Sequence, residues 1–243
     1  MQQFSILLGV GALFGLLLLV WRAPKIETER TLDAGLWILF AALVGGRAMA
    51  VGVNFQYYQT HPGEMLQVWL GGISGVGAFA GGLVAIIILS LWWKHPAGKL
   101  ADAVLPLAGV IAIMAWLGCW ADSCGYGLPS VEWWAIPGRD EWGVLATRVP
   151  VQLLGAILTL ALVWSLDWAS KRIPIPGLIA AIGLFGISAV IFTLSFLRAD
   201  PIPILNGLRL EAWAAIGLMI ISLSAVVVLL LHWKFKKKEN PEG

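Results

Sequence analysis

Seven long apolar runs divide this chain, and they constrain its fold more than any other feature. Crossing the hydrocarbon layer of a bilayer takes about 20 mostly apolar residues in a helix. A transmembrane barrel would instead show short strands of alternating polarity, whereas these runs are continuous. The sequence therefore predicts an all-α fold, a polytopic membrane bundle of about seven transmembrane helices. We place the spans at about 4–21, 35–53, 73–93, 103–120, 149–168, 177–197 and 212–233.

Composition agrees with a membrane class, since 59% of the residues are hydrophobic and 12% are charged. Soluble domains are about half apolar and a quarter charged. The first run could instead be a signal peptide, but it has no Lys or Arg before it and is too long for a signal's apolar core, so we read it as a helix. We take residues 1–233 as a single integral membrane domain and 234–243 as a basic cytoplasmic tail.

The basic residues predict the orientation. With seven spans, alternate loops share a side, and this places eleven Lys and Arg residues on one side and four on the other. The four are Arg139, Arg148, Arg198 and Arg209. The positive-inside rule puts the richer side in the cytoplasm. We therefore expect an outside amino terminus, a cytoplasmic carboxyl terminus, and outward-facing segments at 57–64, 121–148 and 198–211.

The stretch 45–82 combines a charge, interfacial aromatics and many glycines. Arg47 lies inside an apolar run, where an ionised side chain is costly and is a functional hypothesis by default. It either holds a lipid headgroup or pairs with a carboxylate or a helix-end carbonyl inside the bundle. The glycines of 73–82 predict a close helix–helix approach.

A series of short motifs follows in a fixed order along the chain. The series is Gly45-Gly46-Arg47, Tyr58-x-x-His61-Pro62-x-Glu64, Trp69-x-Gly71-Gly72-x-Ser74, Gly81-Gly82-Leu83, the signature region Gly118–Gly127, Pro150-x-Gln152-Leu153 and Phe196-Leu197-Arg198-x-Asp200-Pro201. In this order the motifs resemble those of the prolipoprotein diacylglyceryl transferase family. The similarity is collinear over nearly the whole chain, and members of that family also have seven spans and an outside amino terminus.

The resemblance implies a reaction and a set of residues. Enzymes of that family transfer diacylglyceryl from phosphatidylglycerol to the thiol of a lipobox cysteine in an exported prolipoprotein, and glycerol phosphate leaves. By this resemblance the lipid phosphate would be held by Arg47, Arg148, Arg198 and Arg209, since the planar fork of arginine matches phosphate oxygens. Asp122 or His61 would handle the proton. The signature region contributes Trp116, Gly118, Cys119, Cys124 and Gly127.

The same resemblance implies the setting of the reaction. The partners would be phosphatidylglycerol or a related anionic lipid, a prolipoprotein lipobox segment, and the bacterial cytoplasmic membrane. We expect no cofactor and no metal, because the cysteines lack zinc-type spacing, and no nucleic-acid partner.

Several positions depart from the family pattern. The family's histidine of H-G-G-L falls at Ala80, and the arginine of its signature falls at Trp116. Other departures are Ala34 for a tyrosine, Cys119 for an asparagine, Cys124 and Ser195 for glutamates and Ile191 for an arginine. A non-catalytic lipid-binding paralogue is therefore the second hypothesis. A small transporter is the third, and it is weakened because we see no internal repeat and no intramembrane acid pair.

Individual residues also have simpler interpretations. His61 precedes a proline and could be a turn residue, while Arg209 and Arg198 could lie at the interface only to extend their charges into water. Cys119 and Cys124 could form a disulfide, could be two small residues at a helix end, or could include a nucleophile. A disulfide requires the helix to end between them, since residues five apart on a regular helix point away from each other.

Overall fold

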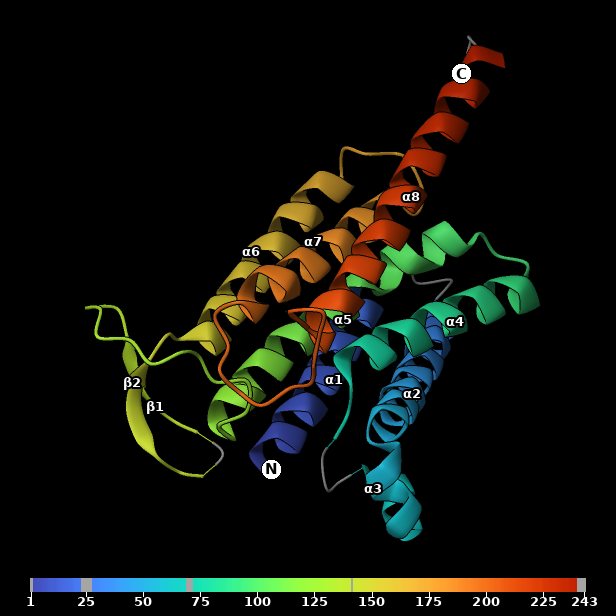
Figure 1. Ribbon diagram of the computed structural model, residues 1–243. Helices are drawn as coiled ribbons and strands as arrows, with labels where there is room; N and C mark the ends of the chain where they lie inside the picture. The colour runs from blue at the N-terminus through green and yellow to red at the C-terminus, as the bar shows by residue number, and fades with distance from the viewer. Residues whose placement is uncertain (1, 23–27, 69–71, 141, 240–243) are drawn as a thin grey trace. The chain divides into compact units, whose positions relative to one another are not determined.

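The computed structural model describes residues 2–22, 28–68, 72–140 and 142–239, and within them seven helices are long and apolar enough to cross a membrane (Figure 1). Their bounds are α1 Gln2–Arg22, α2 Thr28–Val53, α4 Gly75–Trp93, α5 Ala97–Ala121, α6 Val151–Ser170, α7 Leu178–Ser195 and α8 Leu210–Glu239. The predicted polytopic helical class is confirmed. Trp69 and Gly71 of the predicted motifs lie outside the described residues.

Three helices extend beyond the predicted apolar spans, because helices do not stop where apolar residues stop. Helix α2 begins at Thr28 and has Glu29 in its first turn, where a carboxylate is favoured by the helix dipole. Helix α5 begins after Pro96, which cannot lie inside a helix without cost. Helix α8 continues into the basic tail as far as Glu239, and lysines are favoured near a helix carboxyl end.

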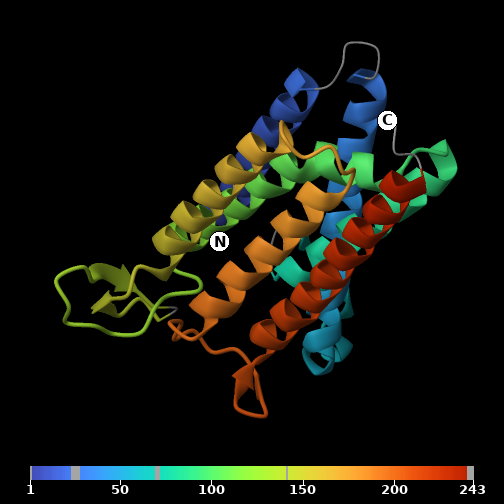
Figure 2. The same ribbon diagram turned by 90° about the horizontal axis from the view of Figure 1, so that it is seen from above.

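The loops contain short elements that the all-α prediction omitted. After α2 come α3 Phe55–Thr60 and the 3-10 helix η1 Pro62–Leu66. Strands β1 Ile136–Arg139 and β2 Leu145–Arg148 form one antiparallel hairpin, and β3 Ile204–Leu205 and β4 Leu208–Arg209 form another. Figure 2 shows the second hairpin between the ends of α7 and α8. Asn206 and Gly207 form its turn with positive φ angles, as Asn-Gly turns of hairpins do.

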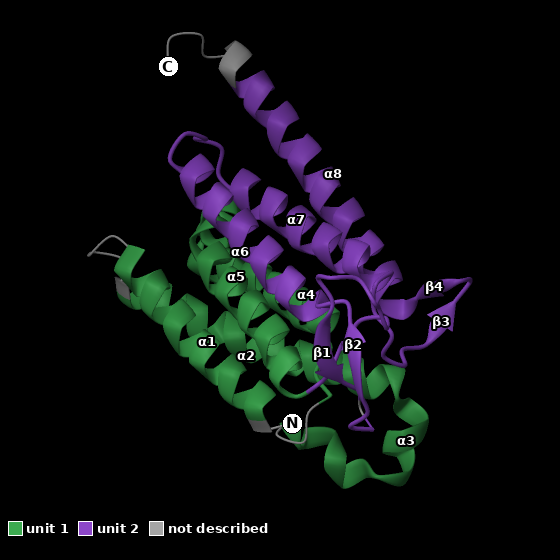
Figure 3. Ribbon diagram, turned by 90° about the vertical axis from the view of Figure 1, so that its left-hand side faces the viewer, with its two compact units in different colours: residues 1–122 green, residues 123–243 purple. Residues whose placement is uncertain are grey.

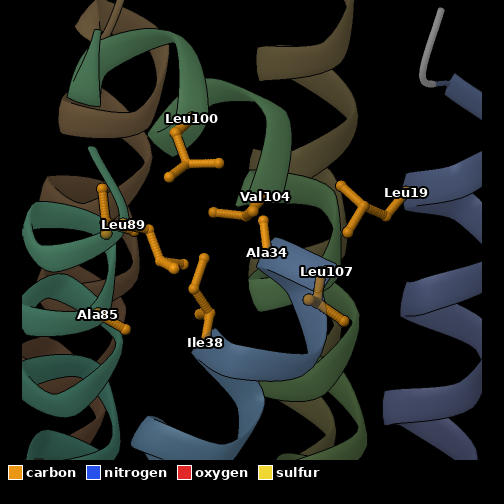
Figure 4. Packing of buried hydrophobic residues seen from close by; sticks show 9 residues of the cluster. Leu19, Ala34, Ile38, Ala85, Leu89, Leu100, Val104 and Leu107 are labelled. Carbon is orange, nitrogen blue, oxygen red and sulfur yellow. The ribbon is translucent and has the colours of Figure 1, made fainter. Parts of the chain in front are cut away.

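The chain divides into two compact units, residues 1–122 and 123–243 (Figure 3). In the first unit α1 packs on α5 and α2 packs on α4. The two pairs share a buried cluster of aliphatic side chains (Figure 4). The labelled members are Leu19, Ala34, Ile38, Ala85, Leu89, Leu100, Val104 and Leu107.

Glycines set the distance between α2 and α4, as the sequence predicted. A Cβ added to Gly77 would collide with the carbonyl oxygen of Gly45, and one added to Gly81 would collide with that of Ala41. A side chain at either position would therefore push the two backbones apart. The close crossing brings the carboxyl end of α2, which carries Arg47, beside the amino end of α4.

In the second unit α7 packs on both α6 and α8. Its interior includes fully buried hydroxyl groups, each bonded to a carbonyl of its own helix. Ser188 donates to Leu184 at 2.7 Å, and Ser222 donates to Met219 at 3.0 Å. The hydroxyl of Thr159 on α6 is also fully buried, but it has no hydrogen-bond partner in the described part of the chain.

Candidate functional site

Arg47 is buried and binds backbone carbonyl groups of the segment that follows α2. Its Nε donates to Met65 at 2.9 Å, its Nη1 donates to Gly72 at 3.0 Å, and its Nη2 donates to Glu64. Its guanidinium also lies 5.3 Å from the ring centroid of Tyr58. Of the two predicted roles, these contacts correspond to pairing with carbonyl groups. Arg47 thereby ties the arm, residues 54–66, to α2.

His61 lies on the exposed side of this arm. Its ring stacks on that of Tyr57 with 4.6 Å between centroids, and its Nδ1 is 2.9 Å from the hydroxyl of Thr60. The Tyr57 hydroxyl donates to the Glu64 carboxylate at 2.8 Å, and this hydrogen bond raises the pKa of Tyr57. The polar groups of the arm therefore lie together on a solvent-facing surface.

Asp122 follows α5 and accepts a hydrogen bond from the backbone N–H of Phe4 at 2.9 Å. Partial burial opposes ionisation, but the hydrogen bond from Phe4 and further favourable interactions, including a hydrogen bond from the backbone of Gln3, together outweigh it and lower the pKa of Asp122. A carboxylate near the first turn of α1 is also favoured by the helix dipole. Asp122 is thus held as an anion, and a low pKa makes a weak proton acceptor.

The predicted signature positions of the first unit lie near the end of α5. Trp116 is half-buried, and Gly118 is buried against Phe4, whose ring a Cβ at that position would strike at 2.8 Å. Cys119 and Cys124 are disulfide-bonded, and because the chain has two cysteines they bridge each other. Helix α5 ends at Ala121, between them, as bridging requires.

The rest of the signature region, residues 124–127, and the next two residues form a stretch, 124–129, that we call the signature segment. It is held on both sides by backbone hydrogen bonds in the second unit. On one side Leu128 donates to Leu197, and Ala199 donates to Tyr126, each at 2.9 Å. On the other side Val149 donates to Leu128 at 2.9 Å. Gly127 is obligatory here, because a Cβ would collide with the carbonyl oxygen of Val149.

Two side chains, in addition to the backbone hydrogen bonds, hold residues 124–129 in place. Gln152 in the first turn of α6 donates through Nε2 to the carbonyl of Cys124 at 3.1 Å. Arg148 is buried, lies 4.8 Å above the ring of Tyr126, and donates to the Asp140 carboxylate at 3.1 Å. Its Nη1 lies 3.4 Å from the carbonyl of Gly127. Arg148 therefore joins the β1–β2 hairpin to the signature segment.

Arg198 and Arg209 form a closed ring of charges with Asp200 and Glu211. Arg198 binds Asp200 through two nitrogens, at 2.8 and 2.7 Å, and Glu211 through the third at 2.7 Å. Arg209 binds Asp200 at 2.9 Å and Glu211 at 3.0 Å. Each carboxylate thus contacts both arginines, and the ring has no net charge.

The ring keeps Arg198 ionised and oriented. Burial opposes the charge, but the hydrogen bonds and charges of Asp200 and Glu211 outweigh it and raise the pKa of Arg198. The ring lies against the signature segment, since a Cβ built on Gly125 would be 3.2 Å from Nη2 of Arg198. A guanidinium has five N–H donors. Bonds within the described residues use three of those on Arg198, which leaves two for a ligand.

The structure therefore gathers five predicted residues in the second unit: Cys124, Gly127, Arg148, Arg198 and Arg209. In the first unit it places Arg47 on α2, His61 on the arm and Asp122 beside α1. Sequence reasoning missed the acidic partners Asp140, Asp200 and Glu211. A signal for two of them was present, since Arg198-x-Asp200 and Arg209-x-Glu211 repeat one pattern of an arginine followed two residues later by an acid.

Comparison with known proteins gives many relatives, and three of them share one name, phosphatidylglycerol–prolipoprotein diacylglyceryl transferase. The relative from Thermosynechococcus vestitus is 30% identical over 139 residues, which is 56% of this chain and 52% of that protein. The one from Synechococcus elongatus is 28% identical over 80% of this chain and 71% of its own length. The one numbered 2 from Streptomyces coelicolor is 30% identical over 93% of this chain and 74% of its own length.

The fractions of chain length that these alignments cover limit what the similarity supports. The alignment with the first relative spans about half of that protein's length. A family-wide comparison covers more, because the sequence profile described as prolipoprotein diacylglyceryl transferase matches residues 1–228. That range includes the first six spans and most of the seventh, together with the arm, the signature region and the ring of charges. The chain belongs to the prolipoprotein diacylglyceryl transferase family.

Proposed function

We propose that this protein transfers diacylglyceryl from phosphatidylglycerol to the lipobox cysteine of prolipoproteins. The thiol sulfur would form a bond to the terminal glyceryl carbon, the bond from that carbon to the phosphate ester oxygen would break, and glycerol phosphate would leave with the electron pair. The proton of the thiol would pass to a base. Such a reaction needs a cation at the phosphate, since negative charge develops on the leaving oxygen.

The observation that carries the proposal is the ring of charges against the signature segment. Asp200 and Glu211 fix the guanidinium of Arg198, so little reorganisation is needed when a phosphate arrives. Its two remaining N–H donors suit a phosphate oxygen. We assign the phosphate to Arg198 and Arg209. Arg47 and Arg148, which bind carbonyl groups and Asp140, we assign to positioning the arm and the hairpin.

For the proton acceptor we favour His61 over Asp122. The hydrogen bonds of the His61 ring involve Nδ1, and histidine is the side chain that most often acts as a general base. Asp122 is stabilised as an anion by Phe4 and is a weaker base. We further propose a multi-pass protein of the bacterial cytoplasmic membrane with its amino terminus outside. Cysteine-accessibility labelling should then find position 139 outside and position 171 inside, and the reverse would overturn this orientation.

The test is transfer from labelled phosphatidylglycerol to a lipobox peptide by purified protein in lipid vesicles. We expect wild type to transfer the label, Arg198→Ala to lose at least about tenfold, and His61→Ala to lose transfer while still binding lipid. The matched control is Arg30→Ala, which removes an exposed arginine of α2. Wild-type protein that binds the lipid and transfers nothing would defeat the proposal.

One observation favours a second candidate, a non-catalytic lipid-binding paralogue. All four arginines expected to bind phosphate already contact carbonyls or carboxylates of the described chain. Ala80 and Trp116 also stand where the family has a histidine and an arginine. This candidate predicts saturable phosphatidylglycerol binding with no product, and the binding should still weaken in Arg198→Ala.

A further inference from the structure

A group of large apolar side chains is exposed outside the membrane-spanning helices, in residues 131–140 and 142–145, which we call the tryptophan loop. Val131 is 99% exposed, Trp133 is 93% exposed and Trp142 is 74% exposed. Val144 and Leu145 are more than half exposed. Soluble surfaces rarely gather apolar groups in this way, and a contiguous exposed patch usually marks an interaction site.

The fold of the hairpin directs these side chains outward. In the register of β1 and β2, Ile136 pairs with Arg148 and Arg139 pairs with Leu145, so the two pairs lie on opposite faces. The face with Arg148 is turned toward the signature segment, which leaves Arg139 and Leu145 exposed. At the tip, Asp140 accepts from the N–H groups of Trp142 and Val144 at 3.1 and 2.8 Å. These two bonds fix the backbone of Trp142 and Val144 beside the tip.

The neighbourhood of the loop identifies what covers it. Strand β2 ends at Arg148 and the membrane-spanning helix α6 begins at Val151, so the loop starts at the bilayer surface. The lipid-facing surface of α6 continues the exposed apolar character with Ile157 and Leu160. Tryptophan is enriched at the membrane–water interface, because its ring is apolar and its N–H reaches water.

The charged residues of the loop are also compatible with binding at a membrane surface. Arg139 lies exposed on the outer face of the hairpin, where it can meet an anionic headgroup. Glu132 is also exposed and opposes this attraction, so the apolar contacts have to carry the binding. We propose that the tryptophan loop is an interfacial anchor, which docks on the headgroup region of the same bilayer that the helices span. The proposal is independent of whether the protein transfers diacylglyceryl.

Two positions on the hairpin separate a docked loop from an upright one. Along the chain, Thr147 is four residues from the start of α6 and Trp142 is nine residues from it. A strand rises about 3.3 Å per residue. An upright hairpin would therefore hold Trp142 much farther from the bilayer than Thr147. A docked hairpin would bring Trp142 to the same depth or deeper.

The experiment uses full-length protein with Trp142→Cys or the control Thr147→Cys, each labelled with an environment-sensitive fluorophore. Both natural cysteines are disulfide-bonded and will not take the label. The protein is reconstituted in vesicles of phosphatidylcholine and phosphatidylglycerol, with or without brominated acyl chains. We expect the label at 142 to be blue-shifted and quenched at least as strongly as the label at 147.

Quenching at 147 without quenching at 142 would overturn the anchor. So would a label at 142 that stays open to aqueous iodide in vesicles and becomes shielded only when a lipobox peptide is added, since the surface would then bind the peptide. A second measurement guards against a local defect in the cysteine variants. In wild type, hydrogen exchange at 142–145 should slow on transfer from detergent to vesicles, and unchanged exchange would count against docking.

Discussion

Arg198 is the residue whose replacement tests the proposed site most directly, provided that folding and phosphate binding are separated. Its side chain is 15% exposed, and those of Asp200 and Glu211 are 12% and 16% exposed. Arg198→Met would leave two partly buried carboxylates facing Arg209 alone. Removing one partner of a fully buried ion pair costs about 3–5 kcal/mol, and the cost here is smaller because these side chains keep some contact with water. This single variant should therefore lose both stability and transfer, which by itself proves nothing about phosphate.

The double variant Arg198→Met with Asp200→Asn resolves the ambiguity. It removes one arginine and one carboxylate together, so the remaining pair, Arg209 and Glu211, keeps its hydrogen bond and stays neutral. Removing one partner of a buried pair leaves an uncompensated charge, whereas removing both charges together does not. We therefore expect most of the lost stability to return in the double variant, while transfer stays low.

The size of the transfer defect follows from the hydrogen bonds that Arg198 has left to give. One charge-assisted bond contributes about 1.5–3 kcal/mol, and about 1.4 kcal/mol corresponds to tenfold. Transfer by the double variant should therefore fall at least about tenfold. Arg198→Lys should recover part of the activity, because it keeps the charge and loses the planar fork.

The assays are thermal unfolding in detergent and label transfer from phosphatidylglycerol in vesicles, run on the same preparations. Wild-type transfer by the double variant would remove Arg198 from the phosphate site. Wild-type stability of the single variant would instead refute the energetic role of the ring. A double variant that remains as unstable as the single one would show that the two carboxylates are not coupled through Arg198.

Three further predictions concern other contacts. Mass spectrometry after thiol blocking should find no free thiol, and two alkylated cysteines would contradict the bridge. Replacing Cys119 and Cys124 by Ser should lower the free energy of unfolding by at most about 2 kcal/mol, because the closed loop is short. The bond to Glu64 raises the pKa of Tyr57, so Glu64→Gln should let the phenol ionise at lower pH in an ultraviolet titration, and an unchanged titration would count against the bond. The stability that this bond gives to the wild-type protein should be lost as pH rises through the pKa of Tyr57. Thr159→Val should raise the free energy of unfolding by about 1 kcal/mol, since it removes a buried hydroxyl without a partner in the described chain. The control Ser188→Ala should not raise it, because the hydroxyl of Ser188 is bonded to the carbonyl of Leu184.

The membrane fold was predictable because its cause is local. Each span needs only enough consecutive apolar residues, and the glycines of 73–82 mark a close crossing whatever their partner is. The ends were less predictable, because polar residues such as Glu29 continue a helix when they lie favourably in its dipole. The β1–β2 hairpin was missed for a related reason. Its strands have four residues each and depend on pairing with each other.

The site was predictable in its arginines and not in their partners. An arginine at an outward loop is visible in the sequence, but whether it is paired depends on residues that only the fold brings near. Asp200 precedes the β3–β4 hairpin and Arg209 ends β4, nine residues later, and the two still form an ion pair at 2.9 Å. Arg148 meets Asp140 across the turn of the β1–β2 hairpin in the same way. Pairs of this kind require the hairpin register, which no periodicity in the chain records.

The neutral ring constrains how a phosphate could bind at all. A site of net positive charge attracts a phosphate from a distance, whereas Arg198, Arg209, Asp200 and Glu211 cancel one another outside the immediate neighbourhood. A phosphate diester would therefore gain little until it meets the N–H donors directly. Binding would then depend on the direction of those donors more than on charge, which is a property of the guanidinium fork. This is why Arg198→Lys, which leaves the charge of the ring unchanged, distinguishes oriented donors from simple attraction better than any variant that alters the charge.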